Sequence, residues 1–118
     1  MKNKIMIVDD DPNLRLLYQK ELAEDNYAII TAENAEEALD KLSHEGCQLV
    51  VLDIEMPEVS GLELVTRIKK DSPDTKVILN SAYPMYKADF KSWLADDYLV
   101  KSSDLSPLKE KIKQIMDE

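Results

Sequence analysis

Four short segments of the chain are apolar at nearly every position, and a fifth segment is weaker. Strands without alternation of apolar and polar residues are typical of a parallel sheet that helices cover on both faces. The sequence therefore predicts a buried parallel sheet with five strands. The predicted strands are residues 5–8, 28–31, 49–54, 76–80 and 98–100, of which 28–31 is the weaker one.

Between the strands, apolar residues recur every three or four positions, which is the spacing of amphipathic helices. Two of these helices have strong start signals, because Asn34 and Ser60 are each followed three residues later by a glutamate. Strands that alternate with helices predict one α/β domain over residues 1–118, a three-layer α/β/α sandwich with five helices. The predicted helices are residues 14–22, 35–42, 62–68, 84–94 and 105–115.

Charge and composition exclude several classes of function. The formal net charge of −9 argues against direct nucleic-acid binding, because Lys and Arg supply most of the affinity for phosphate backbones. No apolar run approaches the roughly 18 residues that span a bilayer, so we expect a cytoplasmic protein that does not bind membranes. The single cysteine, Cys47, is expected to be a buried small side chain, and the single histidine, His44, a surface helix residue.

Polar side chains follow the predicted strands at the points where ligands bind to open parallel sheets. The first helix begins without the glycines that a dinucleotide or phosphate loop needs, and it has carboxylates instead. Carboxylates at that position favour a hard cation such as Mg²⁺. Asp11, directly before Pro12, is instead expected to cap the first helix. The polar residues at this edge are Asp9, Asp10, Asp53, Asn80, Ser81 and Lys101.

These residues resemble the receiver domain of bacterial two-component response regulators. The resemblance rests on Asp9-Asp10, on "DIEMPEVSG" beginning at Asp53, on Ser81-Ala82, and on Tyr98 three residues before Lys101. It implies a flavodoxin-like strand order of 2-1-3-4-5. It also implies that Asp53 accepts a phosphoryl group from a histidine kinase or a histidine phosphotransfer protein, in a reaction that needs Mg²⁺.

The resemblance also implies a role for each residue of the site. Asp10, Asp53 and the backbone carbonyl of Glu55 would ligate Mg²⁺ directly, and Asp9 would act through a water. Lys101 would pair with the Asp53 carboxylate and then with a phosphoryl oxygen. Ser81 and Tyr98 would form a switch that alters the face made by the segment 84–94, the strand 98–100 and the last helix. That face is also a possible homodimer surface.

The residue after Lys101 sets this chain apart from the usual pattern of the family. The family usually has proline, joined by a cis peptide, where this chain has Ser102. Because a cis bond before a non-proline residue costs about 2.5–4 kcal/mol, either Lys101-Ser102 is a rare cis bond or the loop takes another path. Glu55 and Tyr83 flank the expected path of an attacking water, so we expect them to set the lifetime of the phosphoryl group.

Two other functions remain open. A degenerate receiver would bind partners without being phosphorylated, and the Lys101-Ser102 step is the feature that favours it. A Mg²⁺-dependent phosphohydrolase would also use an aspartate nucleophile, but 118 residues leave little room to enclose a substrate. The chain has no output domain, so it either works alone or belongs to a longer regulator, and the absence of a linker after the last helix favours a free-standing protein.

Overall fold

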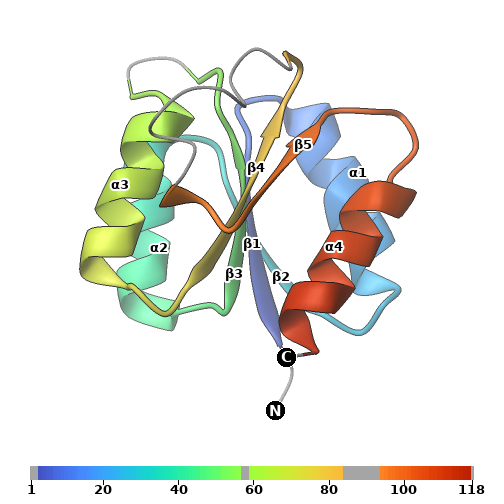
Figure 1. Ribbon diagram of the computed structural model, residues 1–118, viewed down its shortest axis with the longest axis horizontal. Helices are drawn as coiled ribbons and strands as arrows, with labels where there is room; N and C mark the ends of the chain where they lie inside the picture. Colours follow the sequence, from blue (N-terminus) through green and yellow to red (C-terminus); the bar gives the residue numbers. More distant parts are fainter. Residues whose placement is uncertain (1–2, 57–58, 84–93, 118) are drawn as a thin grey trace.

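The computed structural model describes residues 3–56, 59–83 and 94–117. A central sheet carries helices on both faces (Figure 1), as the apolar pattern predicts. The part of the chain that is described contains four helices, and the predicted helix at 84–94 lies almost wholly outside it. The elements are β1 (Lys4–Val8), α1 (Pro12–Ala23), β2 (Ala28–Ala32), α2 (Ala35–Glu45), β3 (Leu49–Asp53), α3 (Gly61–Asp71), β4 (Lys76–Ser81), β5 (Asp97–Val100) and α4 (Ser106–Met116).

The five strands are parallel and lie in the order β2-β1-β3-β4-β5, which confirms the order that the family resemblance implies. In this register Asp53 at the end of β3 lies beside Asn80, and Ser81 at the end of β4 lies beside Val100. The carboxyl ends of the strands therefore meet at one edge of the sheet, the upper edge in Figure 1. The start of β1 and the end of α4 lie at the opposite edge.

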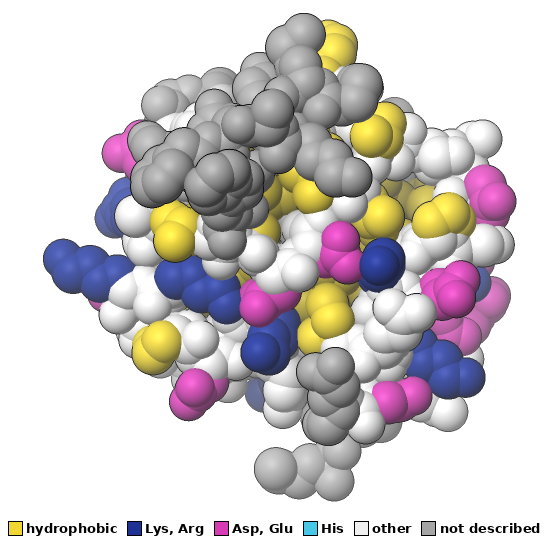
Figure 2. Space-filling model, in the orientation of Figure 1, with side chains coloured by type: hydrophobic (Ala, Val, Ile, Leu, Met, Phe, Trp, Pro, Cys, Tyr) yellow, Lys and Arg dark blue, Asp and Glu magenta, His cyan; other side chains and the backbone are white. Residues whose placement is uncertain are grey.

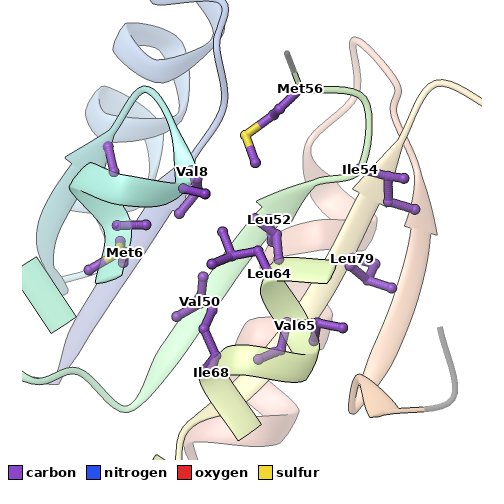
Figure 3. Packing of buried hydrophobic residues seen from close by; sticks show 14 of the residues in the cluster. Met6, Val8, Val50, Leu52, Ile54, Met56, Leu64, Val65, Ile68 and Leu79 are labelled. Atoms are coloured by element: carbon purple, nitrogen blue, oxygen red, sulfur yellow. The ribbon is translucent and has the colours of Figure 1, made fainter. Parts of the chain in front are cut away.

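Two hydrophobic clusters hold the helices on the sheet, one on each face. Helices α2 and α3 cover one face, and α1 and α4 cover the other (Figure 1). Side chains of β3 and β4 pack directly against α3 (Figure 3), and full burial of each leucine contributes about 1.5–3 kcal/mol. The residues of this contact are Val50, Leu52, Leu64, Val65, Ile68 and Leu79.

Side-chain caps fix the starts of three helices at the positions that the sequence predicts. The Asp11 carboxylate accepts hydrogen bonds from the backbone N–H groups of Asn13 and Leu14, at 2.9 and 3.4 Å. Asn34 and Ser60 each accept one from the backbone N–H three residues further along, at 2.8 and 3.3 Å. A cap of this kind contributes about 1 kcal/mol. The cap of α1 also fixes the short loop that follows β1.

The surface mixes charged and apolar side chains. On the face with β5 and α4, acidic and basic side chains lie among apolar ones (Figure 2). Large apolar side chains that reach the surface include Leu16 and Val100, which are 52% and 47% exposed. In the ranges 3–56, 59–83 and 94–117, every helix is too short or too polar to cross a bilayer.

Gly61 permits a close approach between the start of α3 and the end of β3. Its N–H donates to the carbonyl of Ile54 at 2.9 Å, and a Cβ added to it would lie 2.2 Å from the backbone oxygen of Asp53. A side chain at this position requires the backbone of β3 or α3 to move. The glycine therefore sets the position of the Asp53 backbone.

We expect Gly61→Ala to displace the end of β3. The free energy of unfolding should fall by about 1–3 kcal/mol or more. Gly46→Ala is the matched control, because Gly46 has a φ of +71° but no atom within 4 Å of an added Cβ. Both variants should lose stability in urea unfolding. Only Gly61→Ala should shift the backbone NMR signals of Asp53 and Glu55, and equal effects of the two variants on these signals would refute the role of Gly61.

Candidate functional site

The structure brings the predicted acidic residues together at the carboxyl edge of the sheet. Asp9 and Asp10 follow β1, and Asp53 is the last residue of β3. Asp9 and Asp53 are buried and Asp10 is exposed, yet one carboxylate oxygen from each lies within 4.8 Å of the others. Such a group of like charges is unfavourable unless a cation lies among them.

Lys101 supplies part of the balancing charge. Its ammonium nitrogen lies 3.0 Å from Asp9 Oδ2 and 3.3 Å from Asp53 Oδ1. Burial alone would lower the pKa of Lys101, but the two carboxylates outweigh it and raise that pKa above its usual value. When all three aspartates are ionised, one ammonium leaves the cluster with net negative charge.

These surroundings strongly change the pKa of the Asp53 carboxyl group. Burial, then a hydrogen bond with the Glu55 side chain, then the charge of Asp9 raise the pKa of Asp53 to about 7, and Lys101 acts in the opposite direction. Desolvation disfavours the charged form of a carboxyl group, and a bound cation would favour it. A proton and a cation would therefore compete for Asp53.

The donor set fits Mg²⁺, which prefers carboxylate, carbonyl and water oxygens. Both oxygens of Asp9 already accept from protein donors, since Oδ1 accepts from the Asp11 N–H at 2.9 Å and Oδ2 pairs with Lys101. Asp53 Oδ1 likewise accepts from the Glu55 N–H at 3.2 Å. The engaged oxygens of Asp9 suit its predicted contact with the metal through a water, and the exposed carboxylate of Asp10 suits direct ligation.

The hydroxyl of Ser81, which is fully buried, lies in a continuous chain of hydrogen bonds. Ser81 Oγ donates to Glu55 Oε1 at 2.6 Å and accepts from the Tyr83 N–H at 3.0 Å. The carbonyl of Tyr83 accepts from the Tyr98 hydroxyl. The predicted switch residues Ser81 and Tyr98 are therefore linked through the backbone of Tyr83, whose own side chain is 52% exposed.

The loop that carries Lys101 follows a path without a cis peptide. The peptide bonds within the described ranges are all trans, including Lys101-Ser102. Lys101 N–H donates to the carbonyl of Ser81 at 2.6 Å, which continues the pairing of β5 with β4 beyond Val100. Ser102 Oγ then accepts from the Asp104 N–H at 3.1 Å, and Asp104 accepts from the Ser106 N–H at 3.0 Å. Two short side-chain turns thus order this loop without proline.

The sequence does not predict the contacts of Tyr18 and Arg15 near the site, whereas Asn80 is among the polar residues that it predicts at this edge. Asn80 Nδ2 donates to the Tyr18 hydroxyl at 2.9 Å, and both residues are at least 96% buried. Arg15 donates to the backbone oxygen of Asp9 at 2.6 Å. An amide inside an apolar strand is a usable signal for Asn80, because buried polar groups need partners. The helical spacing treats Tyr18 as an apolar residue, and it gives no indication that Arg15 contacts the site.

The two residues expected to have no role in the chemistry lie away from this edge. Cys47 is half-buried against the core, and burial is the main cause that raises the pKa of its thiol to about 11, so the thiol is inert near neutral pH. His44 is an exposed residue of α2 with Nδ1 2.8 Å from the carbonyl of Asp40. The exposed position of His44 agrees with the sequence interpretation, whereas Cys47 is less buried than the sequence predicts.

The raised pKa of Asp53 predicts how stability depends on pH without metal. The folded protein holds this proton more tightly than the unfolded chain, whose pKa is near 3.8. The resulting stabilisation is complete below about pH 4 and is lost as pH rises towards 7. Asp53→Asn should therefore raise the free energy of unfolding by about 1–3 kcal/mol more at about pH 8 than at about pH 4.

This experiment uses urea unfolding with a chelator present, followed by circular dichroism. Asp74→Asn is the matched control, because Asp74 is exposed. It should show no such pH dependence. Asp53→Asn could instead raise the free energy of unfolding by the same amount at both pH values. That result would contradict the inference that burial disfavours the charged form of Asp53.

A family model for the response regulator receiver domain matches residues 5–113. Response regulator ArlR of Staphylococcus aureus is 31% identical over 114 residues, which are 96% of this chain and 52% of that protein. The chain thus spans about half the length of the curated relatives it matches.

Solved structures also resemble this chain over nearly its whole length. Response regulator protein TrrA of Thermotoga maritima in complex with Mg²⁺-BeF is 51% identical, with a TM-score of 0.93 over 98% of this chain and 99% of that one. TrrA in complex with the histidine kinase ThkA has the same identity and coverage and a TM-score of 0.91. A receiver domain protein (CheY-like) from Methanospirillum hungatei JF-1 is 31% identical, with a TM-score of 0.93 over 99% of this chain and 95% of that one. The match over residues 5–113, together with these relatives, shows that the chain belongs to the response regulator receiver domain family.

Proposed function

We propose that the chain accepts a phosphoryl group on Asp53 from a histidine kinase or a histidine phosphotransfer protein. The observation that carries this proposal is the buried Asp53 carboxylate, with the Lys101 ammonium 3.3 Å away and two further aspartates beside it. The relative TrrA was solved with Mg²⁺-BeF and also with the histidine kinase ThkA, which supports both the chemistry and the class of partner.

In the proposed reaction, an Asp53 oxygen attacks the phosphorus of a phosphohistidine. A P–O bond forms, the P–N bond breaks, and the imidazole keeps the electron pair of that bond. Lys101 moves from the Asp53 carboxylate to a phosphoryl oxygen, which keeps a positive charge beside the growing negative charge. Ser81 lies on the other side of the site and donates its O–H to another phosphoryl oxygen.

A Mg²⁺ ion would be held by Asp10, Asp53 and the backbone carbonyl of Glu55, with Asp9 acting through a water. When bound, it would offset the repulsion between the carboxylates and the phosphate and stabilise the charge of the transition state. The protein's own part is to hold three carboxylates within 4.8 Å of one another and to keep Asp9 fixed with the Asp11 N–H.

The phosphorylated protein would signal through the face formed by β5, α4 and the segment 84–94, which we propose on its sequence pattern as the fifth helix. Ser81 and Tyr98 are the proposed switch, since they are linked through Tyr83. Only contacts that differ between the two states can shift the population, and a phosphoryl contact with Ser81 is of that kind. The same face is the proposed surface for a homodimer.

We further propose that Glu55 and Tyr83 set the lifetime of the phosphoryl group, because both lie beside Ser81. A Tyr83→Ala, Glu55→Asn variant should then lose its phosphoryl group faster than the parent. We propose that the receiver domain comprises residues 1–118 and acts in the cytoplasm, where histidine kinases present their phosphohistidine. In this role it is a signalling module, and it catalyses only its own phosphorylation and dephosphorylation.

The alternative function is an interaction module that is not phosphorylated. The sequence feature that favours it is the Lys101-Ser102 step. Lys101 nevertheless pairs with Asp53 along a trans path, so this departure gives little support to the alternative. A phosphohydrolase is disfavoured by the family match.

Incubation with acetyl phosphate and Mg²⁺, followed by intact-mass measurement, should show a gain of one phosphoryl group. Asp53→Asn should abolish the gain, and omission of Mg²⁺ should do the same. Lys101→Ala should slow it by roughly 10²-fold or more, as expected when a charged group that stabilises the transition state is removed. Asp74→Asn should behave like the parent, because Asp74 is exposed.

A parent protein that gains no phosphoryl group under any of these conditions would favour the unphosphorylated interaction module. A gain that persists in Asp53→Asn would place the acceptor elsewhere.

A further inference from the structure

Glu55 contacts the proposed phosphoacceptor through its backbone and the proposed switch residue Ser81 through its side chain. Its Oε1 accepts the Ser81 hydroxyl at 2.6 Å, and its backbone N–H donates to Asp53 Oδ1 at 3.2 Å. A phosphoryl group that is bonded to Asp53 and also contacts Ser81 has to lie between these two residues. The Glu55 carboxyl group therefore occupies the Ser81 donor that such a phosphoryl group would use.

Ser81 cannot donate a hydrogen bond to Glu55 and to a phosphoryl oxygen at the same time. A serine hydroxyl has one hydrogen to donate, and in this structure that hydrogen goes to Glu55. The Ser81 oxygen also accepts from the Tyr83 N–H at 3.0 Å, and the Tyr83 carbonyl accepts from Tyr98. The contact with Glu55 therefore holds the first member of the chain that ends at Tyr98.

Three features of the Glu55 side chain favour its displacement from Ser81. Its second oxygen, Oε2, is buried and has no hydrogen-bond partner within the described ranges, which is unfavourable for a carboxylate. The residue as a whole is only half-buried, so its side chain has a route to solvent. A phosphoryl group on Asp53 would add a second negative charge within a few ångströms of Glu55, and like charges at that distance repel.

We propose that the Glu55 carboxylate is an internal substitute for the phosphoryl group, which holds Ser81 in the unphosphorylated protein and is displaced when Asp53 is phosphorylated. This inference rests on the proposed function, and it names how the switch is held before the signal arrives. Phosphorylation then exchanges one anionic partner of Ser81 for another. Because the two partners make a similar contact, the shift in population at Tyr98 is smaller than it would be without Glu55.

The first test needs neither metal nor phosphate. NMR spectra of the parent with ¹³C-labelled tyrosine and ¹⁵N-labelled backbone report on the Tyr98 ring and the Tyr83 amide. Glu55→Ala should shift both signals, and Ser81→Ala should shift them too. In the double variant, Glu55→Ala should add no further shift, because its effect passes through Ser81. Glu63→Gln, an exposed glutamate at the start of α3, should leave both signals in place.

The second test uses beryllofluoride, a tetrahedral anion that takes the place of a phosphoryl group on a carboxylate, at saturating Mg²⁺. Glu55→Ala should bind it on the order of five- to tenfold more tightly than the parent, because no carboxylate has to be displaced. This gain should vanish in the Ser81→Ala background. Glu55→Gln should gain less, since its amide oxygen still accepts from Ser81.

The outcomes separate the two proposals. Tyr98 and Tyr83 signals that are unchanged in Glu55→Ala, or an equal gain in affinity with and without Ser81, would overturn the role of Glu55. A parent that binds no beryllofluoride would instead refute the proposed function, and the metal-free spectra would still decide whether Glu55 holds Ser81.

Discussion

The contact of Lys101 with Asp9 and Asp53 is the interaction on which the rest of the site depends. Two buried carboxylates in one site repel each other, and the cost of holding them rises as water is excluded. The sheet order places β1 and β3 side by side, so these carboxylates are neighbours as a result of the topology. Lys101 reaches both from beyond β5, the far edge of the same sheet, and its position depends on the pairing of β5 with β4.

The packed apolar core and the exchangeable hydrogen bonds of the site lie at different positions along the strands. Apolar side chains fill both faces of the sheet below the edge, and the polar groups begin where the strands end. The backbone of Gly61 packs against Asp53, so the acceptor cannot move without α3. Ser81 and Glu55, by contrast, are held by hydrogen bonds that another anion can replace. A fixed acceptor beside an exchangeable partner is an arrangement that can respond to a single covalent change.

The sequence predicted the strands, three helix caps and the edge at which the polar residues meet, because these follow from local periodicity and from the rule that parallel strands end together. It could not predict the contacts of particular side chains across that edge. Glu55 was identified as a neighbour of the reaction, but its bond to Ser81 depends on a rotamer. The path after Lys101 was left open, because the turns at Ser102 and Asp104 depend on the loop as a whole. The helical pattern counts Tyr18 as an apolar core residue, and it does not predict a partner for the Tyr18 hydroxyl.

The hydrogen bond between Tyr18 and Asn80 links two positions that are 62 residues apart in the chain. Neither group is reached by water, so replacing one residue with an apolar side chain leaves the other with an unsatisfied polar atom in the core. A double replacement that fills the same volume removes both polar atoms together. The two positions therefore constrain each other, and a replacement in α1 is best tolerated together with a replacement in β4.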